Sequence, residues 1–304
     1  MAETIAIGRR RIEVSNLEKV FYPETGFTKG EVIDYYRSVS EALVPHLRYR
    51  PVTLKRYPNG VEGPFFYEKS CPKHRPEWVK TVALRRKQDG KDVHYCQLNG
   101  EAALVWAANL ADLELHVSLA TARSTRRPKA VVFDLDPGEG TGVIECADIA
   151  LRLRDIFAAL ELECFVKTSG SKGLQLYVPL NSRVRYDDTK PWAQAVARHL
   201  EAEAPDEIVS KPSKEARRGK VFVDWSQNDF HKTTVCVYSL RAKQTPIAST
   251  PLEWDEVERA LERSSAESLT FTSDEVLKRI EVHGDLFAPV LELEQKLPEL
   301  DLEG

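Results

Sequence analysis

The sequence predicts a mixed α/β protein, because short runs of strand-forming residues alternate with longer segments of helical periodicity. Glycine and proline punctuate these runs, most clearly where the apolar run 130–138 stops at Pro137 and Gly138. No internal repeat or flexible linker divides the 304 residues. We therefore expect one large domain over residues 1–290, followed by an acidic tail over 291–304. Within the domain we expect an N-terminal part (about 1–115), a middle part (about 116–250) and C-terminal helices (251–290).

The elements follow from local patterns. The first predicted helix begins at Thr28, where Glu31 completes a capping box and Val32 and Ile33 start an apolar face. Further helices are predicted from apolar residues at three- and four-residue spacing, at 101–110, 144–160, 192–203, 254–263 and 273–281. Strands are predicted where β-branched and aromatic residues cluster, at 52–57, 93–98, 117–119, 130–138, 164–168, 174–178 and 221–225.

The composition is that of a globular protein, with 42% hydrophobic and 30% charged residues. The longest apolar runs are far shorter than the ~18 residues that span a bilayer, and the N-terminus carries no apolar signal segment. Five cysteines, at positions 71, 96, 146, 164 and 236, favour reduced core thiols over a disulfide framework. We expect a cytoplasmic protein with no membrane partner.

Charge is distributed unevenly along the chain. The formal net charge is −4, yet residues 1–100 hold 18 lysines and arginines against 12 acidic residues, and residues 251–304 hold 5 against 15. A polyanionic partner for the first 250 residues is compatible with this pattern, since affinity for phosphates depends on where the basic residues lie. Uneven charge without a functional role is the alternative that composition alone favours.

Acidic residues interrupt two of the predicted strands. Asp134 and Asp136 are two positions apart in 130–138, so they project from the same face. Their mutual repulsion among apolar neighbours is costly unless a cation compensates, and carboxylate oxygens suit Mg²⁺ or Mn²⁺. Asp224 ends the strand 221–225 in the same way, although a simple strand-end cap is the alternative for it. Three such carboxylates could hold two metals, as phosphoryl transfer requires.

Two segments could bind phosphate. Residues 169–173 (SGSKG) form a turn whose backbone amides, Ser169 hydroxyl and Lys172 ammonium could cradle an anion, although an ordinary hairpin turn explains the pattern equally well. The spacing of a P-loop is absent. A basic cluster precedes the Asp224 strand, as a triphosphate site would require: Lys211, Lys214, Arg217, Arg218 and Lys220.

Basic residues beside aromatic ones in the N-terminal part are typical of nucleic-acid contacts, where bases stack on rings and phosphates meet cations. Lys19 and Lys29 flank one aromatic pair, and Lys55 with Arg56 precedes Phe65 and Phe66, which could equally belong to the core. His116, among apolar residues, is by itself more typical of a satisfied core histidine than of a ligand. A zinc site is a weak alternative at Cys71, His74, His94 and Cys96, because the spacing is atypical.

Six segments, in this order, resemble the polymerase domain of bacterial DNA ligase D, a member of the archaeo-eukaryotic primase superfamily that acts in non-homologous end joining. They are residues 15–23 (SNLEKVFYP), 51–60 (PVTLKRYPNG), 114–116 (ELH), 132–137 (VFDLDP), 168–173 (TSGSKG) and 217–228 (RRGKVFVDWSQN). The resemblance covers nearly the whole chain. It implies a primase-like fold in which a modified RRM-like sheet carries the acids, with DNA contacts in the part up to about residue 115.

The resemblance also implies roles for individual residues. Asp134, Asp136 and Asp224 would be catalytic and would bind two Mn²⁺ or Mg²⁺ ions, with no organic cofactor. The incoming nucleotide would contact His116, Ser169, Lys172, Arg217, Lys55 and Arg241. DNA would contact Arg56, Phe65 and Phe66, and Lys19 and Lys29 would capture a 5′-phosphate across a gap.

The implied activity is template-directed nucleotidyl transfer, in which a primer 3′-OH is extended with NTP or dNTP at gaps and broken DNA ends. A DNA ligase and Ku are the implied partners, either as separate proteins or as fused domains, and the implied location is the nucleoid. Two alternatives remain open. The strand with Asp134 is similar to the nucleophile strand of haloacid-dehalogenase-type phosphatases, and a non-catalytic DNA end-binding module would need the lysines and aromatics alone.

Overall fold

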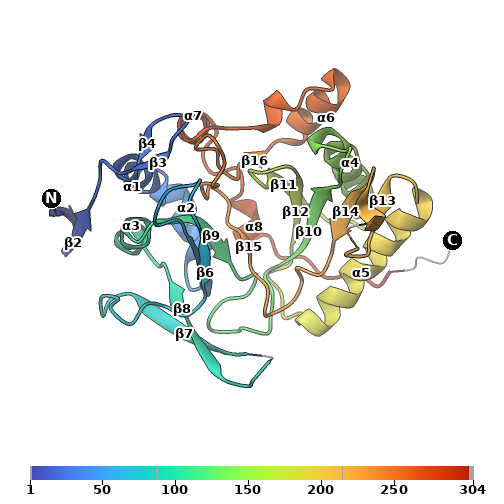
Figure 1. Ribbon diagram of the computed structural model, residues 1–304. Helices are drawn as coiled ribbons and strands as arrows, with labels where there is room; N and C mark the ends of the chain where they lie inside the picture. The colour runs from blue at the N-terminus through green and yellow to red at the C-terminus, as the bar shows by residue number, and fades with distance from the viewer. Residues whose placement is uncertain (1, 87, 214, 301–304) are drawn as a thin grey trace. The chain divides into compact units, whose positions relative to one another are not determined.

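The computed structural model describes residues 2–86, 88–213 and 215–300 (Figure 1). The fold is mixed α/β, as the sequence predicts. Contacts divide the chain into two compact units, each made of three segments. Unit 1 comprises Met1–Thr125, Thr233–Ser249 and Phe271–Asp285, and unit 2 comprises Arg126–Lys232, Thr250–Thr270 and Leu286–Gly304.

Unit 1 is built around an antiparallel sheet in the order β15-β9-β5-β8-β7, with β6 also paired to β5. Its strands are β5 (Val52–Arg56), β6 (Phe66–Glu68), β7 (Lys80–Arg85), β8 (Asp92–Gln97), β9 (Asp112–Val117) and β15 (Thr234–Val235). Two small hairpins join β1 (Ala2–Ile7) to β2 (Arg10–Ser15) and β3 (Val20–Tyr22) to β4 (Phe27–Thr28). The helices are α1 (Lys29–Ser38), α2 (Ser40–Leu47), α3 (Glu101–Asn109) and α7 (Ser273–His283).

Helix α1 begins where the sequence predicts. The Thr28 side chain accepts a hydrogen bond from the Glu31 amide, and the Glu31 carboxylate accepts one from the Thr28 amide, which completes the capping box. Two buried tyrosines tie the helix to its surroundings, since Tyr36 Oη donates to Leu113 O (2.7 Å) and Tyr35 Oη donates to Tyr238 O (2.8 Å). The Tyr36 bond ties α1 to β9, the strand that carries Glu114 and His116, and the Tyr35 bond ties α1 to the segment after β15.

Unit 2 contains a sheet in the order β13-β14-β10-β12-β11-β16, in which the β13 and β14 pair is parallel and the other pairs are antiparallel (Figure 1). Its strands are β10 (Ala130–Pro137), β11 (Phe165–Thr168), β12 (Leu174–Pro179), β13 (Ile208–Val209), β14 (Val221–Asp224) and β16 (Pro251–Leu252). The helices are α4 (Val143–Ala159), α5 (Tyr186–Glu203), α6 (Trp254–Arg263) and α8 (Pro289–Glu292), with short 3₁₀ turns at Glu215–Arg217 and Glu267–Leu269.

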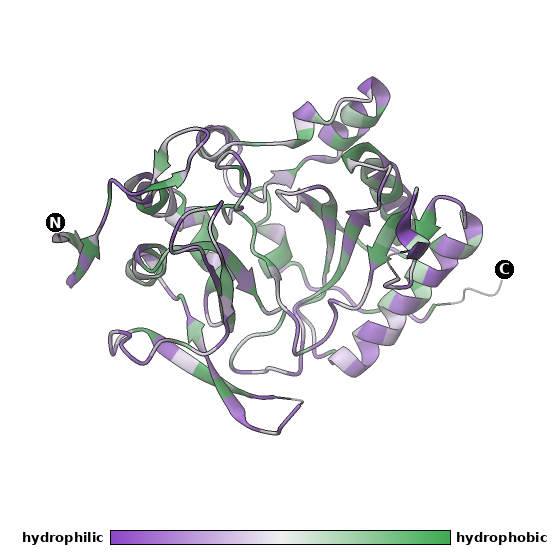
Figure 2. Ribbon diagram, viewed as in Figure 1, coloured by the Kyte–Doolittle hydropathy of each residue, from purple (hydrophilic) through white to green (hydrophobic). Residues whose placement is uncertain are grey.

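Apolar side chains of β10 pack against two of these helices. The Phe133 ring lies 5.4 Å from the ring of Phe157 on α4 and 6.4 Å from that of Trp192 on α5. Figure 2 shows hydrophilic and hydrophobic residues alternating along α5, as expected for a helix with one face on a sheet. Because side chains alternate along a strand, the acids of β10 project from the opposite face to Phe133.

Two predicted elements differ from the structure by more than two residues at one end. Helix α5 begins at Tyr186 rather than at 192, because the Asp188 carboxylate caps its start by accepting from the Arg185 amide (2.9 Å) and Pro191 is accommodated inside the helix. The strand expected at 117–119 is wrong except for Val117, because β9 runs from Asp112 to Val117 and includes the polar residues Asp112, Glu114 and His116.

Two further expectations differ from the structure. Cys71 and Cys96 form a disulfide rather than remaining reduced, whereas Cys146, Cys164 and Cys236 are free and buried as expected. The pairing brings together the segment after β6 and strand β8, which lie 25 residues apart in the sequence. It also leaves the weak zinc alternative without its two thiolates.

Residues of the predicted acidic tail pack onto unit 2. The Gln295 side chain donates to Pro179 O (2.7 Å) and Glu163 O (3.0 Å), and Trp192 Nε1 donates to Pro298 O (3.0 Å). Residues 301–304 of that tail lie outside the described residues. Within the part of the chain that is described, no helix has the length and apolar character needed to cross a membrane.

Candidate active site

The three predicted catalytic acids lie in adjacent strands of unit 2. Asp134 on β10 is directly opposite Asp224 on β14, and residues opposite each other in an antiparallel pair share a face. Asp136 lies two residues beyond Asp134 on the same strand and therefore on the same face. The sheet thus gathers three carboxylates that are separated by up to 90 positions in the sequence.

Burial and neighbouring negative charge both affect the pKa of Asp134. Burial raises the pKa of Asp134 to about 7, and the nearby carboxylates of Asp136 and Asp224 also raise it. A hydrogen bond from Gln175 and the charge of Lys167 act in the opposite direction. A further positive charge, such as a bound cation, would therefore stabilise the ionised form of Asp134.

The donor set fits a hard divalent cation in kind, since it consists of carboxylate oxygens on one face of a sheet. The side chains do not form a ready-made cage, however, because no group of three or more His, Cys, Asp or Glu residues in the described ranges is arranged to hold a metal. In this conformation the two Asp224 oxygens accept hydrogen bonds from Ser226 N and Gln227 Nε2, both at 2.8 Å. Those bonds restrain Asp224 beside β10 but leave carboxylate lone pairs available.

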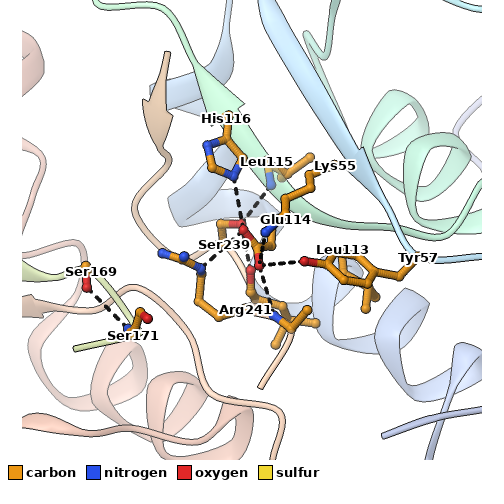
Figure 3. A network of polar contacts seen from close by, with 12 residues as sticks. Lys55, Tyr57, Leu113, Glu114, Leu115, His116, Ser169, Ser171, Ser239 and Arg241 are labelled. Atoms are coloured by element: carbon orange, nitrogen blue, oxygen red, sulfur yellow. Dashed lines mark hydrogen bonds and ion pairs between the residues drawn. The ribbon is translucent and has the colours of Figure 1, made fainter. Parts of the chain in front are cut away.

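The turn 169–173 packs directly on the acidic strand. Ser169 Oγ accepts from the amides of Ser171 and Gly173, both at 3.2 Å, and Ser169 N donates to Gly173 O (2.9 Å) (Figure 3). A Cβ on Gly173 would lie 1.8 Å from Leu135 O, so only glycine permits this approach. The segment is a hairpin turn between β11 and β12, and the same geometry places Lys172, which is exposed, next to β10.

Arg217 lies close to the end of β10. Its guanidinium carbon is 3.8 Å from the ring centroid of Phe222, which is directly opposite Asp136. A Cβ on Gly138 would meet Arg217 O at 1.7 Å, so the chain just after β10 touches the Arg217 backbone. The Arg217 Nε atom is buried with no hydrogen-bond partner among the described residues, as expected of a group that binds an anion. Lys214, of the same predicted cluster, lies outside the described residues.

Unit 1 contains a different polar centre, organised around Glu114 on β9 (Figure 3). This buried carboxylate is contacted through Oε1 by Lys55 Nζ (3.1 Å), Tyr57 Oη (3.2 Å) and Ala242 N (3.2 Å), and through Oε2 by His116 Nε2 (3.1 Å) and Arg241 Nε (3.4 Å). Burial acts to raise the pKa of Glu114, but the hydrogen bond with His116 and the charges of Arg241 and Lys55 outweigh it and lower the pKa. Burial lowers the pKa of His116, against the opposing effect of Glu114. His116 is therefore one member of a polar network and not an isolated core histidine.

Aromatic rings surround the Lys55 ammonium. Nζ lies 4.6 Å from the ring centroid of Phe65, 5.3 Å from that of Tyr57 and 5.5 Å from that of Tyr67. Phe65, Phe66 and Tyr67 are 51%, 44% and 54% exposed, so the alternative that Phe65 and Phe66 belong to the core is wrong. The exposed rings are available for stacking.

Arg56 has local partners. Its Nε donates to Leu110 O (2.7 Å), its NH1 group pairs with Glu68 (2.7 Å), and its guanidinium lies 5.2 Å from the ring centroid of Phe66. It supports β6 and the exposed Phe66 in this conformation.

Lys19 and Lys29 form a pair of neighbouring amines. Lys29 Nζ donates to Ser15 O (2.6 Å), and Lys19 Nζ donates to Pro58 O (2.6 Å) and Asn59 Oδ1 (2.9 Å). Burial, together with the charge of Lys19, lowers the pKa of Lys29 to about 8. No carboxylate among the described residues forms an ion pair with either amine, which is the electrostatic condition for an anion site.

The predicted site residues are divided between the units. Unit 2 brings together Asp134, Asp136, Asp224, Ser169, Lys172 and Arg217, whereas unit 1 holds His116, Lys55, Arg241, Lys19, Lys29, Arg56, Phe65 and Phe66. Local sequence patterns did not assign a role to Glu114, Tyr67, Lys167 or Gln175. Glu114 could have been found from its spacing of two from His116, which puts both side chains on one face of a strand.

Comparisons with known proteins identify the family of the chain. Residues 28–287 match the family model described as LigD, primase-polymerase domain. The chain is 40% identical over 282 residues to the multifunctional non-homologous end joining protein LigD of Mycolicibacterium smegmatis, covering 92% of this chain and 36% of the relative. It is 31% identical over 276 residues to the bifunctional non-homologous end joining protein LigD of Bacillus subtilis, covering 90% and 43%.

A solved structure gives the same result. The polymerase domain from Mycobacterium tuberculosis ligase D in complex with DNA superposes with a TM-score of 0.85 at 37% sequence identity, covering 93% of this chain and 99% of that one. The chain thus spans well under half the length of the two LigD relatives but nearly all of this domain. On the sequence and the fold together, the chain belongs to the LigD primase-polymerase domain family.

Proposed function

We propose that this chain is a template-directed nucleotidyltransferase that extends a primer 3′-OH with NTP or dNTP at gaps and broken DNA ends. The observation that carries the proposal is the clustering of Asp134, Asp136 and Asp224 on one face of β10 and β14, where burial and mutual repulsion raise the pKa of Asp134 to about 7. A bound divalent cation would offset the repulsion among these carboxylates, which otherwise favours protonation of Asp134.

Asp134, Asp136 and Asp224 would hold the Mn²⁺ or Mg²⁺ ions. When bound, these ions activate the primer hydroxyl and neutralise charge that develops on the departing pyrophosphate. The chain's own residues would bind and orient the triphosphate. In unit 2 these are Ser169 and Lys172 of the turn and Arg217, whose buried Nε has no partner among the described residues. In unit 1, His116, Lys55 and Arg241 would contact the nucleotide from the network around Glu114.

DNA would be held by unit 1 through two features. Lys19 and Lys29 would bind the 5′-phosphate of a downstream strand, because the two amines share a region without a paired carboxylate in the described part of the chain. The exposed rings of Phe65 and Phe66 would stack on bases, with Arg56 holding Phe66 in place. The solved relative is a polymerase domain in complex with DNA, which supports DNA binding by this chain.

A DNA ligase and Ku are the proposed partners. The two LigD relatives are multifunctional and bifunctional end-joining proteins, and the chain corresponds to 36% and 43% of their lengths. The ligase and Ku activities would therefore come from fused domains or from separate proteins. The proposed location is the cytoplasm, at the nucleoid. The haloacid-dehalogenase alternative is not retained, since the family assignment replaces it.

Extension of a gapped duplex, with and without the downstream 5′-phosphate and with NTP or dNTP, tests the proposal. We expect extension that requires Mn²⁺ or Mg²⁺ and that is lost in Asp134→Ala, Asp136→Ala and Asp224→Ala. Full activity in any of the three would remove the two-metal assignment. Binding of the gapped duplex without any incorporation would instead favour a non-catalytic end-binding module. Equal extension with and without the 5′-phosphate would remove the role given to Lys19 and Lys29.

A further inference from the structure

A row of polar residues crosses four adjacent strands of unit 2 at one level. In the register of the sheet, Lys167 on β11 is opposite Gln175 on β12, and Gln175 is opposite Asp134 on β10. Asp134 is in turn opposite Asp224 on β14. Directly opposite residues share a face, so the four side chains lie on the same side of the sheet. Two of them, Lys167 and Gln175, have no role in the function proposed above.

The hydrogen bonds in this row run from donor to acceptor in one direction, from Lys167 through Gln175 to Asp134. Lys167 Nζ donates to Gln175 Oε1 at 2.7 Å, and the Gln175 side chain in turn hydrogen-bonds the Asp134 carboxylate. An ammonium group can only donate, so it selects the amide oxygen of Gln175 and leaves the amide NH₂ group for Asp134. The opposite amide orientation would place NH₂ against the ammonium and the oxygen against the carboxylate, which is unfavourable at both ends.

Lys167 lies in an environment where a charged group is costly. Its exposure is 0%, that of Gln175 is 3%, and the Tyr177 ring centroid lies 5.7 Å from Nζ. A buried ammonium needs compensating interactions, and an apolar side chain would fill a sheet position without that cost. The contact of Lys167 with the Gln175 amide, which itself touches Asp134, offsets part of this cost and links the ammonium to the acidic strand.

We propose that Lys167 is a positioning residue, which fixes the amide orientation of Gln175 so that Gln175 holds the Asp134 carboxylate in the position from which it binds a divalent cation. The inference rests on the proposed function, because it assigns Asp134 to a metal. Groups that orient a ligand from behind typically change metal affinity about 10- to 100-fold when they are removed.

The test measures Mn²⁺ binding to the purified chain, without DNA or nucleotide, from the electron paramagnetic resonance signal of free Mn²⁺. We expect Lys167→Met and Gln175→Leu each to weaken binding about tenfold. The double variant should bind no more weakly than either single one, since the two residues act through one contact. Additive losses would overturn the proposal, as would wild-type affinity in a folded Lys167→Met protein.

A conservative variant separates orientation from charge. Lys167→Gln removes the charge but retains an NH₂ group that can donate to Gln175 Oε1, so it should recover most of the affinity lost in Lys167→Met. Equal losses in both would show that Lys167 acts by its charge and would overturn the orienting role. Should Lys167→Met fail to fold, the comparison of Lys167→Gln with Gln175→Leu still decides, since only Gln175→Leu is expected to lose affinity.

Two controls keep this result distinct from the proposed function. Lys190→Met removes another lysine of unit 2, which pairs with Asp229 at 2.6 Å, and should bind Mn²⁺ like the wild type. Asp134→Asn should abolish the high-affinity signal. If the wild type itself shows no such signal, the metal site of the proposed function fails; if it does and Lys167→Met matches it, only the positioning role fails.

Discussion

Each unit of the molecule contains a carboxylate with a shifted pKa, and the shifts of Glu114 and Asp134 have opposite directions. In unit 1, Glu114 is surrounded by Lys55, His116 and Arg241, and these partners lower its pKa despite burial. In unit 2, Asp134 is half-buried beside Asp136 and Asp224, and desolvation together with their charges raises its pKa to about 7. The difference lies in the charge of the groups that neighbour each carboxylate. Basic groups of the protein offset the charge of Glu114, whereas two further acids lie beside Asp134, so we expect Asp134 and not Glu114 to bind a cation.

The largest effect expected from this difference is on catalysis in unit 2. Asp134→Asn should lower the rate of primer extension by about 10³-fold, because it removes a carboxylate at which charge must be stabilised in the transition state. The same change should not destabilise the metal-free protein, since it relieves repulsion with two neighbouring acids. Single-turnover primer extension and thermal unfolding measure the two effects.

Asp148→Asn is the matched control for that experiment. Asp148 lies on α4 of the same unit and is a partly exposed partner of Arg152 at 2.6 Å. We expect little change in either measurement, because exposed ion pairs stabilise weakly. A clear loss of folding stability in metal-free Asp134→Asn would show that the acid cluster is balanced by the protein, contrary to the comparison.

The second prediction concerns stability in unit 1. Glu114→Gln keeps the shape of the side chain but removes the charge that three basic groups face, and we expect a loss of about 2 kcal/mol in the free energy of unfolding. The pKa of Glu114 is lowered in the folded protein from its usual 4.5, so its stabilisation is present above pH 4.5 and is lost as the pH falls below it. The free energy of unfolding, measured by urea denaturation, should therefore differ less between wild type and variant below pH 4.5 than above it.

Glu101→Gln controls for the loss of any one acidic residue. Glu101 forms a surface contact with Arg37 at 3.5 Å, for which we expect a change below about 0.5 kcal/mol. If Glu114→Gln were no more destabilising than Glu101→Gln, Glu114 would not be the centre of a balanced network.

Parts of both units could be predicted from the sequence, because the features concerned depend on residues that are close together in the chain. The capping box of Thr28 and Glu31 depends on residues three apart, and the common face of Asp134 and Asp136 depends on residues two apart. Asp224 was recognised because it ends an apolar strand in the same manner. Such features are set by the period of a helix or a strand, which a sequence displays directly.

The features that escaped prediction depend on strand pairing. Glu114 meets Lys55 because β9 pairs with β5 in one particular register, and Gln175 meets Lys167 because β12 pairs with β11. The Cys71–Cys96 disulfide likewise depends on where the segment after β6 lies relative to β8. A shift of one residue in any of these pairings would turn the partners to opposite faces, and nothing in the local pattern of either strand fixes that choice.

The third prediction concerns the exposed aromatic side of the unit 1 network. Phe65→Leu should weaken binding of a single-stranded template by about 1 kcal/mol, because a stacking surface of this kind contributes about that amount per base. Fluorescence anisotropy of a labelled template measures it. Tyr49→Leu, which removes another exposed aromatic ring of unit 1, should leave template affinity unchanged. Equal losses in both variants would mean that the effect is general and not a property of the rings around Lys55.

The smallest expected effect is a pH dependence confined to unit 1. Burial and the charge of Lys19 lower the pKa of Lys29 to about 8, so Lys29 is charged below that pH and becomes neutral above it. The extra affinity that a downstream 5′-phosphate gives to a gapped duplex should therefore fall a few-fold between pH 7 and pH 9, a range in which an ordinary lysine would keep its charge. Lys29→Arg retains a charge throughout this range and should flatten the profile. Lys19→Gln should move the midpoint upward by removing the neighbouring charge, at the expense of affinity at every pH. A 5′-phosphate effect that is constant from pH 7 to pH 9 in the wild type would mean that Lys29 is compensated in the same way as Glu114, and the phosphate site would have to be sought elsewhere on unit 1.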